Sequence, residues 1–315
     1  MSTLPSSDGV SPVDVFALPT GQLSHPDRWL FEDGDEDFIR ARHAYPDYSF
    51  LIRHASGQNI LFDLGLAKES DFDKIPPLIL SLSNITEPKA PEDATDILRR
   101  GPVDPESIST IIFSHLHFDH VGDCTKFPKA RLIAGPGSAA ANGEGWPVNP
   151  KSPNCSAPIQ HPGYHELTFE GDAWKPLGSF DRAHDFFGDG SLFLIDTPGH
   201  MPGHLGALAL TGQSEWVFMG GDCCHHRSLL VGARPMSVTC GPAGQKSFHK
   251  EPEVAAKTIQ KIRELGKLDG GRVFIALAHD SFLVDTMPLY PDKINGWSSS
   301  SWKQDLECIL TRFYQ

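Results

Sequence analysis

Four side chains that commonly bind metal ions stand within six residues of this sequence. The run from 115 to 120 reads His-Leu-His-Phe-Asp-His, and it supplies the imidazoles of His115, His117 and His120 and the carboxylate of Asp119. Two histidines at alternate positions of an extended segment can point to the same side, which suits one metal ion. Asp119 and His120 then point elsewhere and can serve a second ion. The run therefore predicts half of a two-metal site, and a solvated histidine-rich loop is the alternative.

Three single residues of the same kinds, His200, Asp222 and His279, occur further along the chain. Each stands in a polar turn just beyond an apolar run that is expected to be a strand, and the 115–120 run also follows such a strand. Catalytic groups gather at strand ends because the strand fixes the backbone while the loop exposes the side chain. One such residue alone is a weak signal, but four strand ends that carry only histidine and aspartate predict a single site.

The order of these motifs resembles that of the metallo-β-lactamase superfamily over nearly the whole sequence. The motifs that carry the resemblance are His115-x-His-x-Asp-His120, Thr197-Pro-Gly-His-Met-Pro-Gly-His204, Gly220-Gly-Asp222 and Ala278-His-Asp280. The resemblance implies a four-layer αββα sandwich with the site at its edge. It also implies a first metal ion held by His115, His117 and His200, a second held by Asp119, His120 and His279, and Asp222 bridging both.

Two more residues belong to this comparison. Asp63, in Leu61-Phe-Asp-Leu-Gly65, matches an early aspartate of the family, and such a carboxylate fixes a histidine ligand by accepting its second ring N–H. His204 lies in the same turn as His200 and would be the ligand if the register were shifted. The match of Thr-Pro-Gly-His to the family motif favours His200.

Apolar runs between the motifs predict more strands than helices, arranged in blocks. Strands are expected at 13–18, 48–54, 59–64, 109–114, 131–134, 192–196, 206–210, 216–219 and 273–278. Helices are expected at 253–265 and 302–313, with a proline-broken, partly helical stretch at 68–100. This pattern favours an α+β fold in which helices cover sheets. Because no solenoid repeat is present, we expect a single domain over residues 1–315.

The segment 136–180 is rich in proline, glycine, asparagine and serine, which predicts a long irregular loop insertion. Long loops inside compact domains are usually functional. We expect this loop and the segment 75–81 to wall the substrate pocket. Aromatic residues of the loop either contact a flat organic substrate or only pin the loop to the core. These aromatic residues are Trp146, Tyr164, Phe169 and Trp174.

The expected chemistry is hydrolysis. Imidazole and carboxylate ligands without thiolate favour two divalent ions, expected to be zinc, with iron or manganese as alternatives. Such a pair generates a hydroxide from water at neutral pH, and Asp119 can pass a proton to the leaving group. We expect a dinuclear metal-dependent hydrolase that opens a cyclic ester or amide of a small organic molecule by hydroxide attack on the carbonyl. Lactones, γ-lactams and cyclic carbamates all fit, and a detoxifying role would follow.

One position separates this sequence from the branch that it resembles most, the N-acyl-homoserine-lactone lactonases. In those enzymes a tyrosine three residues after the bridging aspartate helps to polarise the substrate carbonyl. This sequence has His225 there. A histidine can donate a similar hydrogen bond, so His225 is expected to be catalytic, and an ordinary loop residue is the alternative.

The same residues are compatible with other functions. A thioesterase of the glyoxalase-II or polyketide type shares the metal ligands, although little chain follows His279 for the helical domain of glyoxalase II. Weak hydrolysis of β-lactams is compatible with the site. A non-catalytic metal-binding scaffold would be expected to lack one ligand, and none is missing.

Composition limits the classes of binding partner and the cellular compartment that we expect. The 27 basic and 40 acidic residues give a net charge of −13, which disfavours nucleic acid and anionic membranes and leaves a small-molecule substrate. No stretch is apolar enough for a membrane span, and the first ten residues lack the features of a secretory signal. The six cysteines show no disulfide framework, so we expect free thiols and a cytoplasmic protein. The tail from 297 to 315 is expected to cap the pocket or the other subunit of a homodimer.

Overall fold

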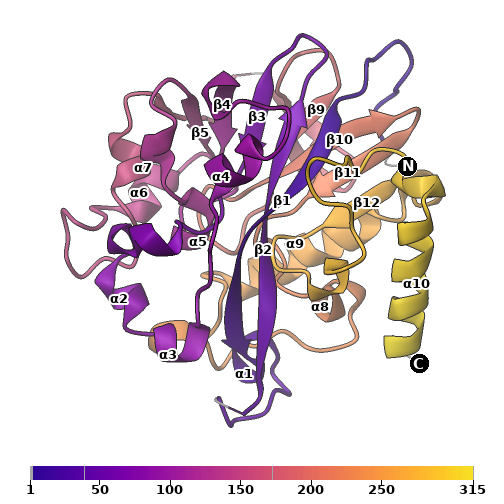
Figure 1. Ribbon diagram of the computed structural model, residues 1–315. Helices are drawn as coiled ribbons and strands as arrows, with labels where there is room; N and C mark the ends of the chain where they lie inside the picture. Colours follow the sequence, from indigo (N-terminus) through magenta and orange to yellow (C-terminus); the bar gives the residue numbers. More distant parts are fainter. Residues whose placement is uncertain (1–2, 39, 172, 315) are drawn as a thin grey trace.

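The computed structural model describes residues 3–38, 40–171 and 173–314. Two six-stranded mixed sheets lie face to face within these residues (Figure 1). The first sheet has the order β1 (Asp14–Pro26), β2 (Arg42–Arg53), β3 (Asn59–Phe62), β4 (Ile108–Ile112), β5 (Arg131–Ala134) and β6 (Tyr164–Glu166). The second has the order β12 (Val273–Ala276), β11 (Glu215–Met219), β10 (Leu205–Gly212), β9 (Leu192–Asp196), β8 (Phe180–Asp185) and β7 (Trp174–Leu177).

Most helices are short and occupy the outer faces and the loops. They are α1 (Asp27–Leu30), α2 (Pro77–Leu80), α3 (Ser83–Thr86), α4 (Ala94–Arg99), α5 (Phe118–Val121), α6 (Ser138–Asn142), α7 (Ala157–Gln160), α8 (Arg227–Val231), α9 (Pro252–Leu265) and α10 (Ser301–Tyr314). Short 3₁₀ turns span Glu69–Lys74, Pro105–Ser107, Cys124–Lys126, Pro242–Gly244, Leu268–Gly270, Ser281–Leu283 and Trp297–Ser299. None of the helices in the described ranges is long and apolar enough to cross a membrane.

Each sheet buries both of its faces, because side chains along its strands point alternately to one face and the other. In β2, Phe50 and Ile52 point into the core between the sheets, while Leu51 points to the opposite face, where α4 packs. Side chains of successive strand residues point to opposite faces, so a strand that is apolar at every position is covered on both sides. The second sheet follows the same rule, because Trp216 of β11 packs with α9 and Val217 packs between the sheets. The predicted α+β class and the αββα sandwich are confirmed.

The arrangement of strands brings the expected site residues to one edge. Strands β3, β4 and β5 are parallel, and so are β11 and β12. Parallel neighbours end at the same edge of a sheet. Asp63 and the 115–120 run therefore leave the first sheet together, and Asp222 and His279 leave the second sheet together.

The expected strands and helices are present, several with shifted ends, and two strands are much longer than predicted. Strand β1 continues to Pro26 and pairs with β2 down to Arg42, after a bulge between Pro19 and Gly21. Prolines and polar residues interrupt the apolar pattern there, so the periodicity stops at residue 18 although the pairing does not. The extension carries His25, which lines the cavity at the candidate metal centre.

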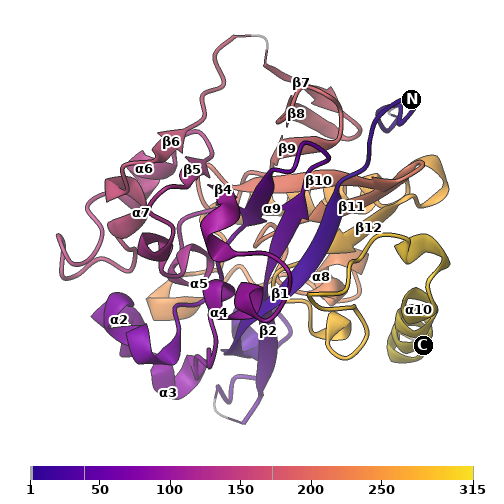
Figure 2. The ribbon, with the colours of Figure 1, turned by 45° about the horizontal axis from the view of Figure 1, so that its top comes forward.

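The prediction of a long irregular loop at 136–180 is only partly right. Irregular stretches alternate with α6, α7, β6 and β7, and the last two strands add an edge to each sheet. Figure 2 shows β7 and β8 together at one end of the second sheet. The carboxylate of Glu166 in β6 accepts the backbone N–H groups of Gly137 and Ala139 at 2.8 and 2.7 Å. These bonds order the segment in place of apolar periodicity, and a composition-based prediction cannot detect them.

The described part of the C-terminal tail packs against the second sheet. Trp297 and Leu306 are buried in the core between the sheets, and Trp302 contacts Phe274 of β12. Helix α10 and helices α2 and α3 stand on opposite sides of the molecule in both views (Figures 1 and 2). None of the described tail residues lines the cavity at the histidine clusters, so the structure does not support a tail that caps the pocket, and contact with a second subunit stays a prediction. Gln315 lies outside the described residues.

The loop after β3 provides a stability prediction. Gly65 has φ +71, and a Cβ added there would overlap the side chain of Thr20, which hydrogen bonds Asp47 O and Ser49 Oγ and cannot easily shift. Gly57 is a matched control, since it has φ +88 and open space around its Cβ position. We expect Gly57→Ala to cost about 1 kcal/mol of unfolding free energy from backbone strain, and Gly65→Ala about 1–3 kcal/mol more from the overlap. Urea unfolding of both variants measures the difference, and equal losses would contradict the packing described here.

Candidate metal centre

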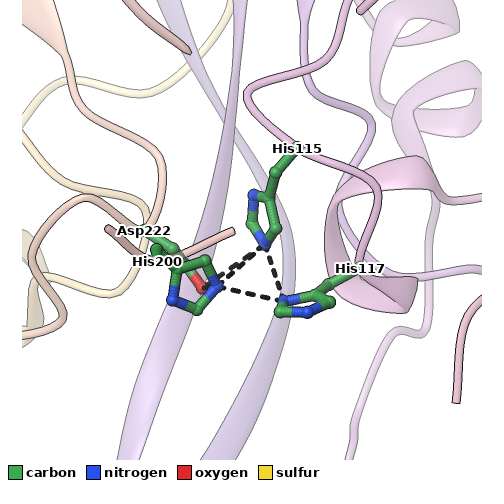
Figure 3. Close-up of side chains that lie close together, drawn as sticks. All are labelled: His115, His117, His200 and Asp222. Atoms are coloured by element: carbon green, nitrogen blue, oxygen red, sulfur yellow. Dashed lines mark hydrogen bonds and ion pairs between the residues drawn. The ribbon is translucent and has the colours of Figure 1, made fainter. Parts of the chain in front are cut away.

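The first group of side chains is built around the 115–120 run. Ligand atoms of His115, His117, His200 and Asp222 all lie within 4.8 Å of one another. Nε2 of His115 lies 2.8 Å from Nδ1 of His117, and Nε2 of His200 lies 3.2 and 3.0 Å from these two nitrogens. Figure 3 shows the three rings turned toward a common point beside the carboxylate. Three imidazole nitrogens converging in this way offer their lone pairs to one cation.

A second group lies next to the first. Ligand atoms of Asp119, His120, Asp222 and His279 are also within 4.8 Å of one another. Helix α5 carries Asp119 and His120, because the chain turns into this helix directly after His117. Oδ1 of Asp222 lies 3.2 Å from His120 Nε2 and 3.1 Å from His279 Nε2. The second group thus joins the loop ends of both sheets.

Asp222 belongs to both groups and offers one oxygen to each. Its Oδ1 faces His120 and His279, whereas its Oδ2 lies 3.5 Å from His200 Nε2 and 3.8 Å from His115 Nε2. The residue is only 3 % exposed. A carboxylate placed in this way can bridge two ions, as the sequence resemblance implies.

Unpartnered buried atoms test whether these residues fit metal ions. His120 Nε2, His279 Nε2 and Asp222 Oδ1 are buried and have no hydrogen-bond partner. A buried polar atom without a partner destabilises the folded protein, so several such atoms facing one point indicate a missing ligand. Divalent cations accept the lone pairs of all of them. The two groups therefore fit a dinuclear metal site.

The electrostatics of the groups agree with this interpretation. Burial lowers the pKa of His115 and His200 well below its ordinary value, so both rings are neutral and their lone pairs are free. Burial also acts to lower the pKa of His279, but Asp222 outweighs it and raises that pKa to about 9. His120 follows the same pattern, because Asp222 and Asp63 outweigh burial and raise its pKa well above the ordinary value. The carboxylates stabilise positive charge on the rings of His120 and His279. A bound cation supplies that charge in place of the ring protons.

Hydrogen bonds to the outer ring nitrogens hold the second group in place. Oδ2 of Asp63 lies 2.9 Å from His120 Nδ1, and its Oδ1 accepts the backbone N–H of Ser114 at 2.7 Å. The Nδ1 atom of His279 lies 2.8 Å from the carbonyl oxygen of Pro46. The structure thus places Asp63 where the resemblance implies, behind a histidine of the second group.

The choice between His200 and His204 follows from the same geometry. His200 belongs to the first group and His204 to neither group. Nδ1 of His204 lies 2.7 Å from Thr197 Oγ1, and its Nε2 accepts the backbone N–H of Asp222 at 3.1 Å. His204 therefore fixes the backbone of Asp222.

A mostly apolar cavity of about 140 Å³ opens onto both groups. His117, Asp119, His200, Asp222 and His279 line its base. Most of its wall comes from α1, from the segment around α2 and α3, and from the loop that precedes α9, and the end of β1 contributes Leu23 and His25. The wall residues are Leu23, His25, Trp29, Leu78, Ile79, Leu82, Thr86, Phe118, Pro153, His225, Pro242, Ala243, Gln245 and Phe248. The cavity can hold a small apolar molecule over the paired groups.

Of the two alternatives for the 136–180 aromatics, the structure favours packing over substrate contact, because Pro153 is the one residue of that segment, among those described, that lines the cavity. Phe169 and Trp174 pack against each other with centroids 5.1 Å apart, and Tyr164 donates to Glu166 at 3.1 Å. Trp174 and Tyr164 also pack against the buried core clusters, and these contacts pin the segment to the fold. The expected wall at 75–81 is confirmed through Leu78 and Ile79.

Several wall residues escaped prediction from the sequence. Trp29, His25 and Phe248 stand in no motif, and their neighbours in sequence give no signal of a site. Only the extended pairing of β1 with β2 and the fold of the loop before α9 bring them to the cavity. His249 follows Phe248 and is equally isolated in the sequence. Histidine content alone would have been the only hint for His25 and His249.

His225 lies in the cavity wall beside the first group. Its Nε2 is 3.2 Å from Asp222 Oδ2, and its ring stacks on Phe248 with centroids 4.6 Å apart and planes 27° from parallel. Both ring nitrogens are buried without a hydrogen-bond partner. Packing therefore holds the ring in place, with Nε2 facing the Asp222 carboxylate and Nδ1 free of any polar partner among the described residues.

Comparison with known proteins gives the family. Residues 44–220 match the sequence profile described as the Metallo-beta-lactamase superfamily. The chain belongs to this superfamily. It is 37 % identical to a protein of Annulohypoxylon moriforme named metallo-hydrolase mfmC, over 96 % of this chain and 88 % of that protein. It is 33 % identical to gamma-lactamase FDB1 of Fusarium pseudograminearum, over 82 % of this chain and 72 % of that protein.

Other relatives are longer or more distant. A Penicillium roqueforti protein named cytochrome P450 monooxygenase mpaDE is 35 % identical over 95 % of this chain, which spans only 37 % of that protein. Among solved structures, an N-acyl homoserine lactone hydrolase with its product at the catalytic metal centre has a TM-score of 0.65 and 20 % identity. The match covers 93 % of this chain and all of that one, so the two share the fold.

The contact between Asp63 and His120 predicts an effect on metal affinity. Asparagine at 63 can keep the left-handed backbone of that residue (φ 62) but not the charge behind the ring. We expect Asp63→Asn to weaken metal binding by about 10- to 100-fold, measured by competition with a chromogenic chelator. Asp123→Asn is the matched control, because Asp123 is also buried and lies three residues after His120 but pairs with Lys74 outside both groups. Equal affinities of the two variants would refute the role of Asp63.

Proposed function

We propose that this protein is a dinuclear metal-dependent hydrolase that opens a small cyclic amide or ester. The proposal rests on one observation above all, the sharing of the Asp222 carboxylate by two convergent groups at the base of an apolar cavity. The proposed ligands are His115, His117 and His200 for the first ion, Asp119, His120 and His279 for the second, and Asp222 for both. Zinc is the proposed metal, with iron and manganese compatible with the same donors.

The named relatives support this substrate class. FDB1 is named a gamma-lactamase, mfmC a metallo-hydrolase, and the solved relative an N-acyl homoserine lactone hydrolase. The size of the cavity supports it as well. Cavities for drug-sized ligands begin at about 300 Å³, and the present one is about 140 Å³. It holds the ring of a γ-lactam, a cyclic carbamate or a γ-lactone, and the adjoining cavity of about 520 Å³, which shares His117, His200 and Pro153 with it, leaves room for a larger substituent.

When bound, the two cations supply a hydroxide nucleophile at neutral pH and polarise the substrate carbonyl. Asp119 lines the cavity, and its Oδ2 lies 3.8 Å from His279 Nε2. Its carboxylate can therefore accept a proton from the attacking water and deliver it to the leaving nitrogen or oxygen. An amide nitrogen needs this proton more than an ester oxygen, because it is the poorer leaving group.

His225 is proposed to donate a hydrogen bond to the carbonyl oxygen as negative charge develops there. Its ring lies on the side of the first group, and stacking on Phe248 fixes its orientation. A donor that is already in place needs no reorganisation during the reaction, and for this reason it stabilises the transition state strongly.

A substrate panel tests the proposed reaction. The metal-loaded protein is assayed with γ-lactones, γ-lactams, cyclic carbamates, thioesters and a chromogenic β-lactam. We expect the five-membered rings to be preferred, and we expect Asp119→Ala to retain its fold and to lose turnover by at least about 10²- to 10⁴-fold. Circular dichroism checks the fold. Preference for thioesters, or full activity of Asp119→Ala, would overturn the proposal.

Replacement of His225 tests the hydrogen bond to the carbonyl. We expect His225→Phe, which keeps the stacking on Phe248, to lower kcat by about 10²- to 10³-fold and to leave the two tightly bound metal ions in place. His225→Tyr restores a donor and should recover part of the lost rate. Elemental analysis accompanies the kinetics. If His225→Phe loses one of the two ions, His225 is a ligand of the pair and the proposed role is wrong.

A further inference from the structure

A third group of buried imidazoles adjoins the paired groups. Ligand atoms of His200, His225 and His249 lie within 4.8 Å of one another. His249 comes from the loop between the 3₁₀ turn Pro242–Gly244 and α9, so this group unites three separate loops. We propose that His200, His225 and His249 form a third cation site, filled only when the metal is in excess, that withdraws His225 from the substrate. The effect on catalysis rests on the proposed function, but the binding itself does not.

Unpartnered nitrogens carry this proposal. Both ring nitrogens of His225, both of His249 and Nδ1 of His200 are buried without a hydrogen-bond partner. The His249 ring stands edge-on to its neighbours, 4.9 Å from the His225 centroid and 5.3 Å from the His200 centroid. If these rings served only for packing, phenylalanine would fill the same positions without leaving a buried polar atom unsatisfied. The same signature of buried, unpartnered atoms marks the paired groups.

The donor set defines the kind of cation. Three imidazoles without a carboxylate suit zinc, cobalt, nickel or copper rather than magnesium or calcium. His249 is buried and both of its ring nitrogens lack a hydrogen-bond partner, so a lone pair is available to a cation. Because the site has no negative ligand, its affinity is expected to be lower than that of the pair bridged by Asp222.

The surroundings explain why this site fills last. A cavity of about 520 Å³ reaches His249 from the surface and is lined also by Lys246 and Lys250, which are exposed. This cavity provides a route for an ion, while the two ammonium groups oppose its binding. His200 also faces the first group, so a third ion competes for a ring that the pair uses. Excess metal is therefore expected to inhibit hydrolysis.

Metal titration of the full chain tests the proposal. Metal-free protein is dialysed against rising Co²⁺ or Zn²⁺, and bound metal is measured by elemental analysis, with the visible spectrum of Co²⁺ as a second readout. We expect about three equivalents in the wild type, the third binding most weakly, and about two in His249→Phe and His249→Gln. His161→Phe is the matched control, because His161 is also buried with an unpartnered Nε2 but belongs to none of the three groups. It should retain the third equivalent.

The outcomes separate this inference from the proposed function. Saturation of the wild type at two equivalents, or a third equivalent that persists in both His249 variants, would overturn the third site. Inhibition of hydrolysis by excess metal should disappear in the His249 variants, and inhibition that persists there would overturn the link to His225. If no substrate of the panel is hydrolysed, the proposed function fails while the stoichiometry still decides the third site. Unfolding curves of both variants verify that each is folded.

Discussion

The buried carboxylate of Asp222 is the constraint on which the rest of the centre depends. It is almost wholly removed from solvent, and each of its oxygens faces a different set of imidazoles. A carboxylate in such surroundings is stable only next to compensating positive charge. His204 fixes the backbone at this position, and β11 supports the turn that carries it. Two sheets with their loop ends at one edge provide the geometry that a single shared carboxylate requires.

Other buried acidic residues near Asp222 add negative charge and so favour the binding of cations. Asp47 is completely buried, neither of its oxygens has a hydrogen-bond partner, and burial raises its pKa to about 7. Asp63 and Asp119 add two further carboxylates to the same region. Repulsion among these groups would destabilise the folded protein, and bound divalent ions would relieve it. Metal binding and folding are thus expected to be coupled in this protein.

The sequence predicted the paired groups well because the chemistry there is local. His115 to His120 form one continuous run, and the remaining expected ligands each follow an apolar strand, so a short window of sequence contains the signal. The cavity wall was poorly predicted because it is not local. Trp29 and Phe248 reach the cavity only through the long pairing of β1 with β2 and the fold of an irregular loop. In the 136–180 segment, the side chain of Glu166 creates order that neither composition nor periodicity reveals.

The wall of the cavity and its base are supported by different parts of the fold. The base stands on the ends of strands, whereas most of the wall is contributed by α1, by the segment around α2 and α3, and by the loop before α9, which belong to neither sheet. Most wall positions, though not His225, can therefore change without moving the residues of the paired groups. In evolution, such a division lets a lineage exchange one ring-shaped substrate for another while the hydrolytic chemistry is inherited unchanged.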